Sequence, residues 1–219
     1  MKLKRDFFVK NTLLVAKNLL GKIIVRKFNN QLIKGKIVET EAYIGPWDLA
    51  SHARFSKQSE KEKLKILDKL YPKIKNKIEN WNLFKKRVLS LEIKITERNI
   101  AEFLTGGHIY IYLIYGKYFQ LNITTYKEGY PECVLLRALE PITKSKIIPN
   151  GPGKLCQYLK LDKSFLFEDL TSSKRIWIED SKIPYKVVCA KRIGIDYAKG
   201  DKLLPWRFYI KDNKFVSKQ

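Results

Sequence analysis

The residues best suited to chemistry lie on a predicted strand at residues 37–43. Side chains alternate between the two faces of a strand, so Glu39, Glu41 and Tyr43 share one face. A carboxylate buried beside an aromatic ring would have a raised pKa and could take a proton from water as a general base. An ordinary solvent-facing stripe is the alternative, and this strand considered alone favours it.

Other kinds of catalytic site find little support. His52 and His108 are the only histidines, and no cluster of Cys or Asp accompanies them, so we expect no metal site. The sequence contains no G-x-S-x-G, H-E-x-x-H, Walker or dinucleotide-binding motif. The remaining possibilities are hydrolysis assisted by a carboxylate, or a protein that catalyses no reaction. We expect His108 to be an ordinary residue at the start of a strand.

The charge balance points to a polyanionic partner. The 219 residues include 44 Lys and Arg against 22 Asp and Glu, a formal net charge of +22. Such a field favours nucleic acid first and membrane surfaces second, although lysine-rich coding could account for part of it. No apolar run approaches the length that spans a bilayer, and we identify no signal peptide.

The cysteines indicate a reducing environment. Cys133, Cys156 and Cys189 are odd in number and far apart, and no C-x-x-C pair is present. Neither a zinc site nor a disulfide framework is therefore predicted, and an intracellular protein fits best. The chain is long enough to bury a sizeable core in one domain.

Residues 108–124 predict a β-hairpin whose tip carries an aromatic ring. In both halves, apolar residues alternate with polar residues or tyrosines. The two apolar sets share a face only if the loop has an odd number of residues, which predicts a loop at residues 115–117. Tyr115 would then stand exposed at the tip, in the shape of a wedge. The other face of the hairpin would carry Tyr110, Tyr112, Gln120 and Asn122.

Further patterns predict the elements that support these residues. Thr12 is the expected N-cap of a helix at residues 12–20, and Asn29 and Asn30 are expected to form a turn. Asn150-Gly151-Pro152-Gly153 opens a predicted helix, in which Lys154 either contacts a phosphate or simply follows a turn. That helix is expected to run through residues 154–159, and a further short helix is predicted at residues 48–54. Strands are predicted at residues 22–28, 32–43, 132–139, 187–195 and 206–210.

Residues 57–94 differ from their surroundings. Ser59 and Glu62 have the spacing of a capping box, and apolar residues then recur three and four apart, as on helices. Pro72 lies within this pattern, so we expect a break there and two helices. The segment resembles a helical insertion. Its basic residues are explained more simply by a solvated face than by a DNA clamp.

Several of these segments together resemble one known family. Glu39-Thr40-Glu41-Ala42-Tyr43-Ile44-Gly45, followed by Asp48, Ala50, Ser51 and His52, is similar to the signature of the alkyladenine (3-methyladenine) DNA glycosylases. HIYIYLIYGKYFQLN resembles their DNA-wedging hairpin. The runs VLLRALEP, GPGKLC and TERN, which begin at residues 134, 151 and 96, resemble three further blocks. The blocks span most of residues 7–210 in the family's order, which is far more specific than any single motif.

The resemblance implies an α+β fold. We expect a single mixed domain over residues 1–219, with an antiparallel, partly open, barrel-like sheet flanked by helices and a protruding β-hairpin, and with residues 57–94 as a helical insertion. The implied partner is double-stranded DNA that contains damaged purines, with no membrane, and the implied state is a monomer. No metal or organic cofactor is implied. The implied location is the cytoplasm of a bacterial type of cell, in association with the nucleoid, or otherwise another intracellular site.

The implied activity is that of a monofunctional DNA glycosylase in base excision repair. Such an enzyme flips a damaged purine out of the duplex and hydrolyses its N-glycosidic bond, leaving an abasic site. The expected substrates are 3-methyladenine, 7-methylguanine, hypoxanthine and ethenoadenine. Glu41 would activate the attacking water. Arg137 would position that water or a phosphate, and a structural ion pair with a buried glutamate is the alternative.

The resemblance also assigns binding residues. Tyr43, His52 and Tyr112 would enclose the extruded base, and the bulk of Asn122 would disfavour the exocyclic amino group of guanine. Tyr115 would fill the gap left in the base stack. The residues expected to contact DNA besides Tyr115 are Lys117, Thr96, Arg98 and Lys154. Packing is the expected role of Tyr110 and Tyr118.

The chain departs from the family pattern in ways that concern DNA contact. The insertion replaces a short basic loop, Glu97 replaces a proline, and Lys117 replaces a methionine common beside the wedge residue. A noncatalytic nucleic-acid-binding module is the competing function. Glu41 argues against it, because a carboxylate that faces a polyanion would repel phosphate.

Overall fold

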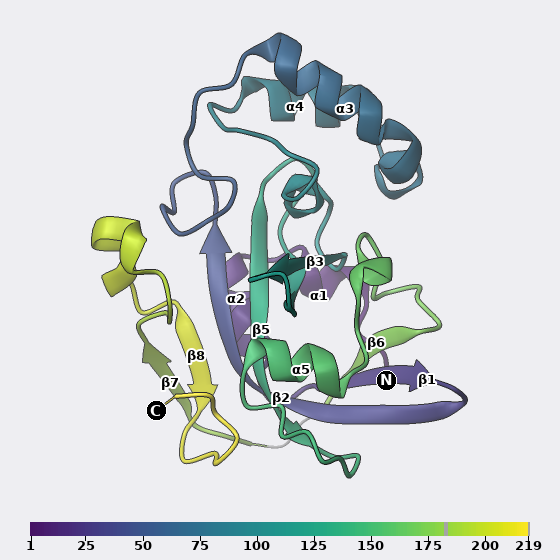
Figure 1. Ribbon diagram of the computed structural model, residues 1–219, viewed down its shortest axis with the longest axis vertical. Helices are drawn as coiled ribbons and strands as arrows, with labels where there is room; N and C mark the ends of the chain where they lie inside the picture. Colours follow the sequence, from purple (N-terminus) through teal and green to yellow (C-terminus); the bar gives the residue numbers. More distant parts are fainter. Residues whose placement is uncertain (182–183, 219) are drawn as a thin grey trace.

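One long strand, β2 (Gln31–Ile44), organises the sheet. Its first half pairs with β1 (Ile23–Phe28) and its second half with β8 (Arg207–Ile210), while β5 (Glu132–Pro141) pairs along the opposite edge. The computed structural model describes residues 1–181 and 184–218. It places the strand that carries Glu39 and Glu41 in the interior of the sheet (Figure 1).

The described residues form an eight-stranded sheet that is antiparallel and open. Its further strands are β3 (Ile109–Ile114), β4 (Tyr118–Thr124), β6 (Ile176–Glu179) and β7 (Val187–Ala190). The predicted α+β class and the open antiparallel sheet are therefore confirmed. The strand predicted at residues 187–195 is too long, since only its first four residues pair with β8. β6 has no counterpart among the predicted strands.

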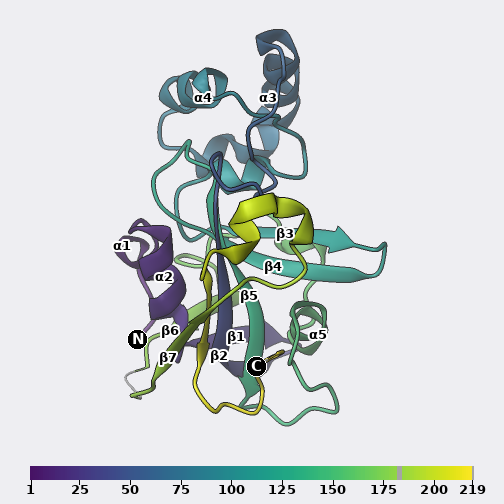
Figure 2. The same ribbon diagram turned by 90° about the vertical axis from the view of Figure 1, so that its left-hand side faces the viewer.

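Helices cover both faces of the sheet. They are α1 (Arg5–Phe8), α2 (Thr12–Leu19) and α5 (Pro152–Tyr158). Figure 2 shows α2 and α5 on opposite sides of the sheet. A hydrogen bond of 2.9 Å from the Thr40 hydroxyl to the Ala16 carbonyl ties β2 directly to α2. The strand that carries the carboxylates is thus held from its neighbours on both edges and from a helix.

The start of α2 corrects the sequence prediction. Asn11, not Thr12, is the N-cap, because its side-chain oxygen accepts the backbone N–H groups of Leu13 and Leu14 at 3.1 and 3.3 Å. Thr12 is buried, and its hydroxyl lies 2.7 Å from that of Thr125. Both residue types are good N-caps. A tertiary contact decides between them.

The hairpin has the predicted register. Ile114 pairs with Tyr118, Tyr112 with Gln120, and the loop consists of residues 115–117. The side chain of Tyr115 is 92% exposed, and its backbone has a φ of 50°. Gly116 follows with a φ of 63°, a conformation that glycine adopts without strain. The hairpin protrudes from the sheet in Figure 2, with its tip free.

Residues 57–94 contain two helices, but the break between them is not at Pro72. α3 (Glu60–Ile74) begins with the predicted capping box and continues through Pro72 to Ile74. Pro72 costs the helix one backbone hydrogen bond, but Ile74 beyond it is buried in a second hydrophobic cluster. The chain turns between Ile74 and α4 (Trp81–Ser90). α3 and α4 lie together at one end of the molecule (Figure 1).

No helix among the described residues is both long enough and apolar enough to cross a membrane.

His108 provides a test of the packing beneath the hairpin. It is buried, and its Nδ1 atom lies 2.8 Å from the Thr105 carbonyl oxygen. Burial lowers the pKa of His108 from 6.5 to about 4. Between these pH values the unfolded chain takes up a proton that the folded protein does not. The stabilisation is therefore complete above the unfolded pKa and is lost as the pH falls towards the folded one.

We expect the free energy of unfolding to fall on acidification, by about 1.4 kcal/mol for each unit of the His108 pKa shift. A His108→Asn variant should lose less stability than the unaltered protein over the same pH interval. Urea unfolding at neutral pH and at mildly acidic pH measures both. An identical loss in the two proteins would contradict a buried, neutral His108.

Candidate active site

A cavity of about 470 Å³ opens where the hairpin meets the ends of β2 and β5. This volume is typical of sites for small molecules, which are roughly 300–1,000 Å³. The cavity brings together most of the residues singled out from the sequence. Its lining includes Tyr43, His52, Arg98, Tyr112, Tyr115, Asn122 and Arg137. Lys117, Thr96 and Lys154 do not line it.

Glu41 lies behind this lining and is fully buried. Its Oε1 atom accepts the backbone N–H of Ile193 at 2.8 Å. Its Oε2 atom accepts the Tyr43 hydroxyl at 2.9 Å and Nη1 of Arg137 at 3.2 Å. All three of these residues line the cavity, so the carboxylate is separated from the open space by its own partners.

Glu39 and Glu41 do not form a solvent-facing stripe. Both side chains are completely buried. Glu39 accepts Nη1 of Arg207 at 2.8 Å and the backbone N–H of Ser217 at 2.7 Å. The alternative that the strand alone favoured is therefore wrong, because partners from distant parts of the chain cover this face of β2.

Arg137 connects the two carboxylates because of an irregularity in the sheet. Glu39 pairs with Ala138 and Thr40 with Leu136, so Arg137 has no residue opposite it on β2. Such bulges redirect side chains. The guanidinium lies 3.5 Å from Glu39 and 3.2 Å from Glu41. The structural ion pair left open by the sequence is present, and Arg137 also lines the cavity.

The environment of Glu41 suits a group that exchanges protons. Burial raises the pKa of Glu41, and the nearby charge of Glu39 adds to the rise. The charge of Arg137 and the hydrogen bonds from Ile193 and Tyr43 oppose it. A general base works best when its pKa lies near the working pH. Burial together with cationic support is therefore an appropriate setting for a carboxylate that accepts a proton from water.

Aromatic rings form one wall of the cavity. His52 and Tyr112 meet edge to face, with ring centroids 4.8 Å apart, and Nδ1 of His52 lies 2.7 Å from the Tyr110 hydroxyl. Burial, reinforced by the charges of Arg98 and Arg54, lowers the pKa of His52 to about 4. The imidazole is therefore neutral at neutral pH.

Asn122 has a fixed position on β4. It is buried, and its Nδ2 atom donates to the carbonyl oxygens of Tyr110 and Gln120 at 3.2 and 3.4 Å. The amide is thus held by the hairpin backbone. Any planar ligand in the cavity meets a side chain whose bulk and orientation are set in advance.

The predicted helix at residues 48–54 is absent. The Asp48 carboxylate instead accepts the backbone N–H groups of Ile44 and Ala50 at 3.2 and 2.9 Å, which holds the segment as a series of turns. Aspartate favours such local bonds over a helix interior. These turns bring His52 to the cavity wall.

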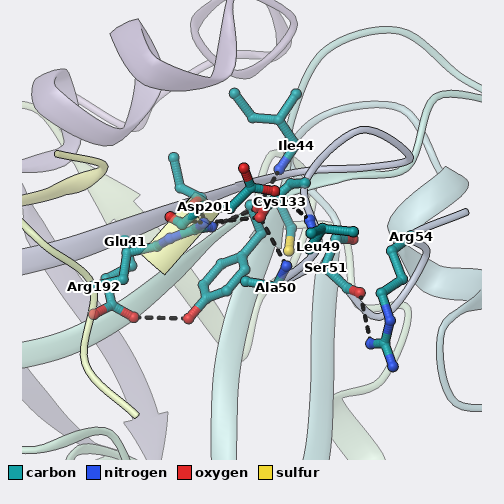
Figure 3. Close-up of polar contacts among 12 residues, drawn as sticks. Glu41, Ile44, Leu49, Ala50, Ser51, Arg54, Cys133, Arg192 and Asp201 are labelled. Carbon is teal, nitrogen blue, oxygen red and sulfur yellow. Dashed lines mark hydrogen bonds and ion pairs between the residues drawn. The ribbon is translucent and has the colours of Figure 1, made fainter. Parts of the chain in front are cut away.

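Arg192 secures this segment and was not identified from the sequence. Its two Nη atoms bind Asp48, at 2.5 and 2.8 Å, with neither side chain exposed. Arg192 also donates to the Ala42 carbonyl at 2.9 Å, and its guanidinium lies over the Tyr43 ring. Figure 3 shows Glu41 and Arg192 in this network, with Leu49 held by Asp201 beside them. The sequence around Arg192 gives no indication that it pairs with Asp48, which lies 144 positions away.

The residues expected to contact DNA have different surroundings. The guanidinium of Arg98 lies 4.5 Å from the Tyr112 ring centre, inside the cavity wall. Lys117 lies over the Tyr118 ring, Lys154 bonds to Asn150, and the Thr96 hydroxyl bonds to Asn99. Thus the structure brings Arg98 to the cavity and leaves the other three outside its lining.

Two further sequence features acquire a structural explanation. Glu97 forms an exposed ion pair with Lys69 of α3, so a lysine of the 57–94 segment neutralises the unusual acid. A Cβ atom at Gly153 would lie 3.0 Å from the Tyr118 ring, which shows that this glycine lets α5 approach the hairpin.

Among the described residues, no three potential ligands come together as a metal site.

Comparison with known proteins gives one consistent result. The sequence model of the family described as "Methylpurine-DNA glycosylase" matches residues 6–66 and 88–214. A protein of Clostridium perfringens (strain SM101 / Type A) is 37% identical over 242 residues, covering 100% of both chains. A protein of Methanocella arvoryzae is 38% identical over 230 residues, covering 99% of this chain and 96% of its own. Both carry the name "Putative 3-methyladenine DNA glycosylase".

Proposed function

The chain belongs to the methylpurine-DNA glycosylase family, and from this premise we propose that it excises damaged purines from double-stranded DNA. In this proposal it flips the damaged nucleotide into the cavity and hydrolyses the N-glycosidic bond, leaving an abasic site. The substrates proposed are 3-methyladenine, 7-methylguanine, hypoxanthine and ethenoadenine. The observation that carries the proposal is the buried Glu41 carboxylate, held by three residues of the cavity wall.

Glu41 is proposed as the general base. An ionised carboxylate offers about four acceptor sites, and three are occupied by Ile193, Tyr43 and Arg137. The remaining capacity can accept a proton from water. The water oxygen attacks the anomeric carbon as the purine leaves with the electron pair of the glycosidic bond. The carboxylate also stabilises the oxocarbenium character that develops on the sugar.

The aromatic wall is proposed to hold the extruded base. Stacking on aromatic rings contributes about 1–3 kcal/mol per base. Tyr43, His52 and Tyr112 line the cavity and supply such surfaces. Because the low pKa of His52 leaves its ring neutral, this ring adds no charge that would repel an alkylated purine that carries positive charge. The tyrosine rings attract such a cation through their π faces.

Tyr115 is proposed as the wedge that stabilises the flipped state. Extrusion of a nucleotide costs a few kcal/mol, and a ring inserted into the vacated space recovers part of the lost stacking. Tyr115 is exposed at the end of the hairpin that also carries Tyr112 and Asn122. The net charge of +22 favours approach to the phosphate backbone. Thr96, Lys117 and Lys154 are proposed as contacts there, and Arg98 as support for the Tyr112 ring.

The remaining features of the proposal concern organisation. A monomer is proposed. The family's sequence model leaves residues 67–87 unmatched, which supports residues 57–94 as an insertion in a single glycosylase domain. Because the proposed substrate is DNA, the proposed location is inside the cell, together with the cell's DNA. Water is the proposed nucleophile, so no cofactor and no lyase step are invoked.

The direct test is incubation with duplex oligonucleotides that contain 3-methyladenine or hypoxanthine. We expect free base to be released, with the strand intact until alkali cleaves the abasic site. Strand cleavage without alkali would contradict a monofunctional mechanism. Binding to the duplex with no base release would favour the noncatalytic binding module.

Substitutions in the hairpin should separate wedging from base selection. We expect Tyr115→Ala to weaken capture of every lesion, by roughly the 1–3 kcal/mol of one stacked ring. Asn122→Ser should instead relax discrimination against undamaged guanine, because a smaller side chain admits the exocyclic amino group. Fluorescence anisotropy and single-turnover excision on matched duplexes measure these effects. Equal changes in lesion preference from both substitutions would count against the two assignments.

A further inference from the structure

Glu102 is a buried carboxyl group in the cavity wall itself, and the mechanism above gives it no role. It lies in a short 3-10 helix, Ile100–Phe103, and is 1% exposed. Its Oε2 atom accepts a long hydrogen bond of 3.4 Å from the Ser51 hydroxyl. Among the described residues its Oε1 atom has no hydrogen-bond partner. A buried carboxylate with so few donors is costly, so this group is expected to keep its proton.

The electrostatic surroundings agree with a protonated Glu102. Burial raises the pKa of Glu102 to about 8, and the charge of Asp48 adds to the rise. The hydroxyls of Ser51 and Tyr110 and the charge of Arg98 oppose it. Two further titratable neighbours are Cys133 of β5 and Tyr112 of β3. Burial raises the pKa of both groups well above neutral pH, so both stay neutral. At neutral pH, Glu102 is therefore an acid with a proton to give.

Tyr110 connects Glu102 to the base-binding wall. Both residues line the cavity, and Tyr110 is near enough to Glu102 to lower the pKa of that carboxyl. The Tyr110 hydroxyl also lies 2.7 Å from Nδ1 of His52. When Glu102 is protonated, it can donate to Tyr110, and Tyr110 can donate to Nδ1. A neutral imidazole that accepts at Nδ1 carries its proton at Nε2. The proton on Glu102 thus sets the tautomer of His52 and makes the ring a donor to a ligand in the cavity.

We propose that Glu102 is the proton source for excision of neutral purines such as hypoxanthine, acting through Tyr110 and His52. This inference rests on the glycosylase function proposed above. A purine alkylated at N3 or N7 already carries positive charge and leaves readily. A neutral purine must gain a proton as it leaves, and Glu41 cannot supply one because its role is to accept.

The proposed step balances. A ring nitrogen of the purine takes the Nε2 proton of His52 while the glycosidic bond breaks and its electron pair moves to the purine. Nδ1 takes the proton of Tyr110, and Tyr110 takes the proton of Glu102. The imidazole ends neutral in its other tautomer, and Glu102 ends as a carboxylate. Solvent returns the proton after the base departs.

The test compares two lesions in matched duplexes, hypoxanthine and 7-methylguanine, in the full-length protein. Glu102→Gln keeps the volume and the neutral charge of the acid but has no proton to transfer. We expect hypoxanthine excision to fall by roughly 10²-fold or more, the range of general acid catalysis, while 7-methylguanine excision falls far less. In the unaltered protein, hypoxanthine excision should also decline above about pH 8, and the variant should lack that decline.

Tyr110→Phe provides a second, independent interruption of the same relay. It should reproduce the selective loss of hypoxanthine excision, and it decides the question if Glu102→Gln does not fold. Equal losses on both lesions, or no loss on either, would overturn the role of Glu102. If the unaltered protein releases neither lesion, the glycosylase proposal itself fails. Release of both lesions with an unchanged ratio in the variants overturns only this inference.

Discussion

Replacing Glu41 with glutamine is expected to reduce base release by roughly 10²–10⁴-fold, the usual contribution of a general base. Glutamine has nearly the same size and can still accept the Ile193 N–H, but it cannot take a proton from water. The side chain is fully buried, so no other base from bulk solvent takes over its role. Single-turnover excision of hypoxanthine measures the loss.

Glu132→Gln is the matched control for this experiment. Glu132 is also a largely buried carboxyl with a raised pKa, but it bonds to Thr12 and does not line the cavity. We expect this variant to excise hypoxanthine at the original rate. DNA binding by Glu41→Gln should persist, because the cavity wall and Tyr115 remain. The proposed mechanism is wrong if Glu41→Gln releases base as fast as the unaltered protein.

The second large effect is expected from Asp48→Ala. Removing one partner of a buried ion pair costs about 3–5 kcal/mol, since the other charge remains buried and uncompensated. Here the stranded group is Arg192, and the backbone N–H groups of Ile44 and Ala50 also lose their acceptor. Activity should fall as well, because this segment positions His52. In addition, Arg192 is the neighbour of Ile193, whose backbone N–H bonds to Glu41.

Urea unfolding and excision assays on the same preparation measure both consequences. Glu97→Ala removes an ion pair of the opposite kind, in which both side chains are more than half exposed. Exposed pairs are screened by water, so we expect no measurable change in stability from this control. If the two variants unfold at the same urea concentration, the Asp48–Arg192 pair does not support the site.

The hairpin could be predicted from sequence because its information is local. Two alternating segments and the parity of the loop fix its register, and the structure has the same loop. The turn at Asn29 and Asn30 follows equally local rules, with φ values of 46° and 61°. By contrast, Pro72 is a local signal that tertiary packing outweighs, since burial of Ile74 extends the helix beyond it.

The site could be predicted only in part. Period-two alternation places Glu39 and Glu41 on one face, but their partners lie far away in the sequence. Arg207 and Ser217 bond to Glu39, and Ile193 bonds to Glu41. Asp48 forms turns rather than a helix because it meets Arg192, 144 positions away. Glu102 is unremarkable in the sequence and becomes notable only when the fold leaves one of its oxygens without a partner. Long-range partners therefore decide what the local pattern leaves open.

The two partners of Glu39 lie at the start of β8 and beyond its end, so the ribosome makes them late. Arg207 and Ser217 follow Glu39 by 168 and 178 positions. A ribosome makes the strand with both carboxylates early, while the groups that neutralise Glu39 are still untranslated. Until they emerge, Glu39 competes with Glu41 for Arg137. A nascent chain that lacks Arg207 therefore has one arginine, Arg137, to balance two buried carboxylates.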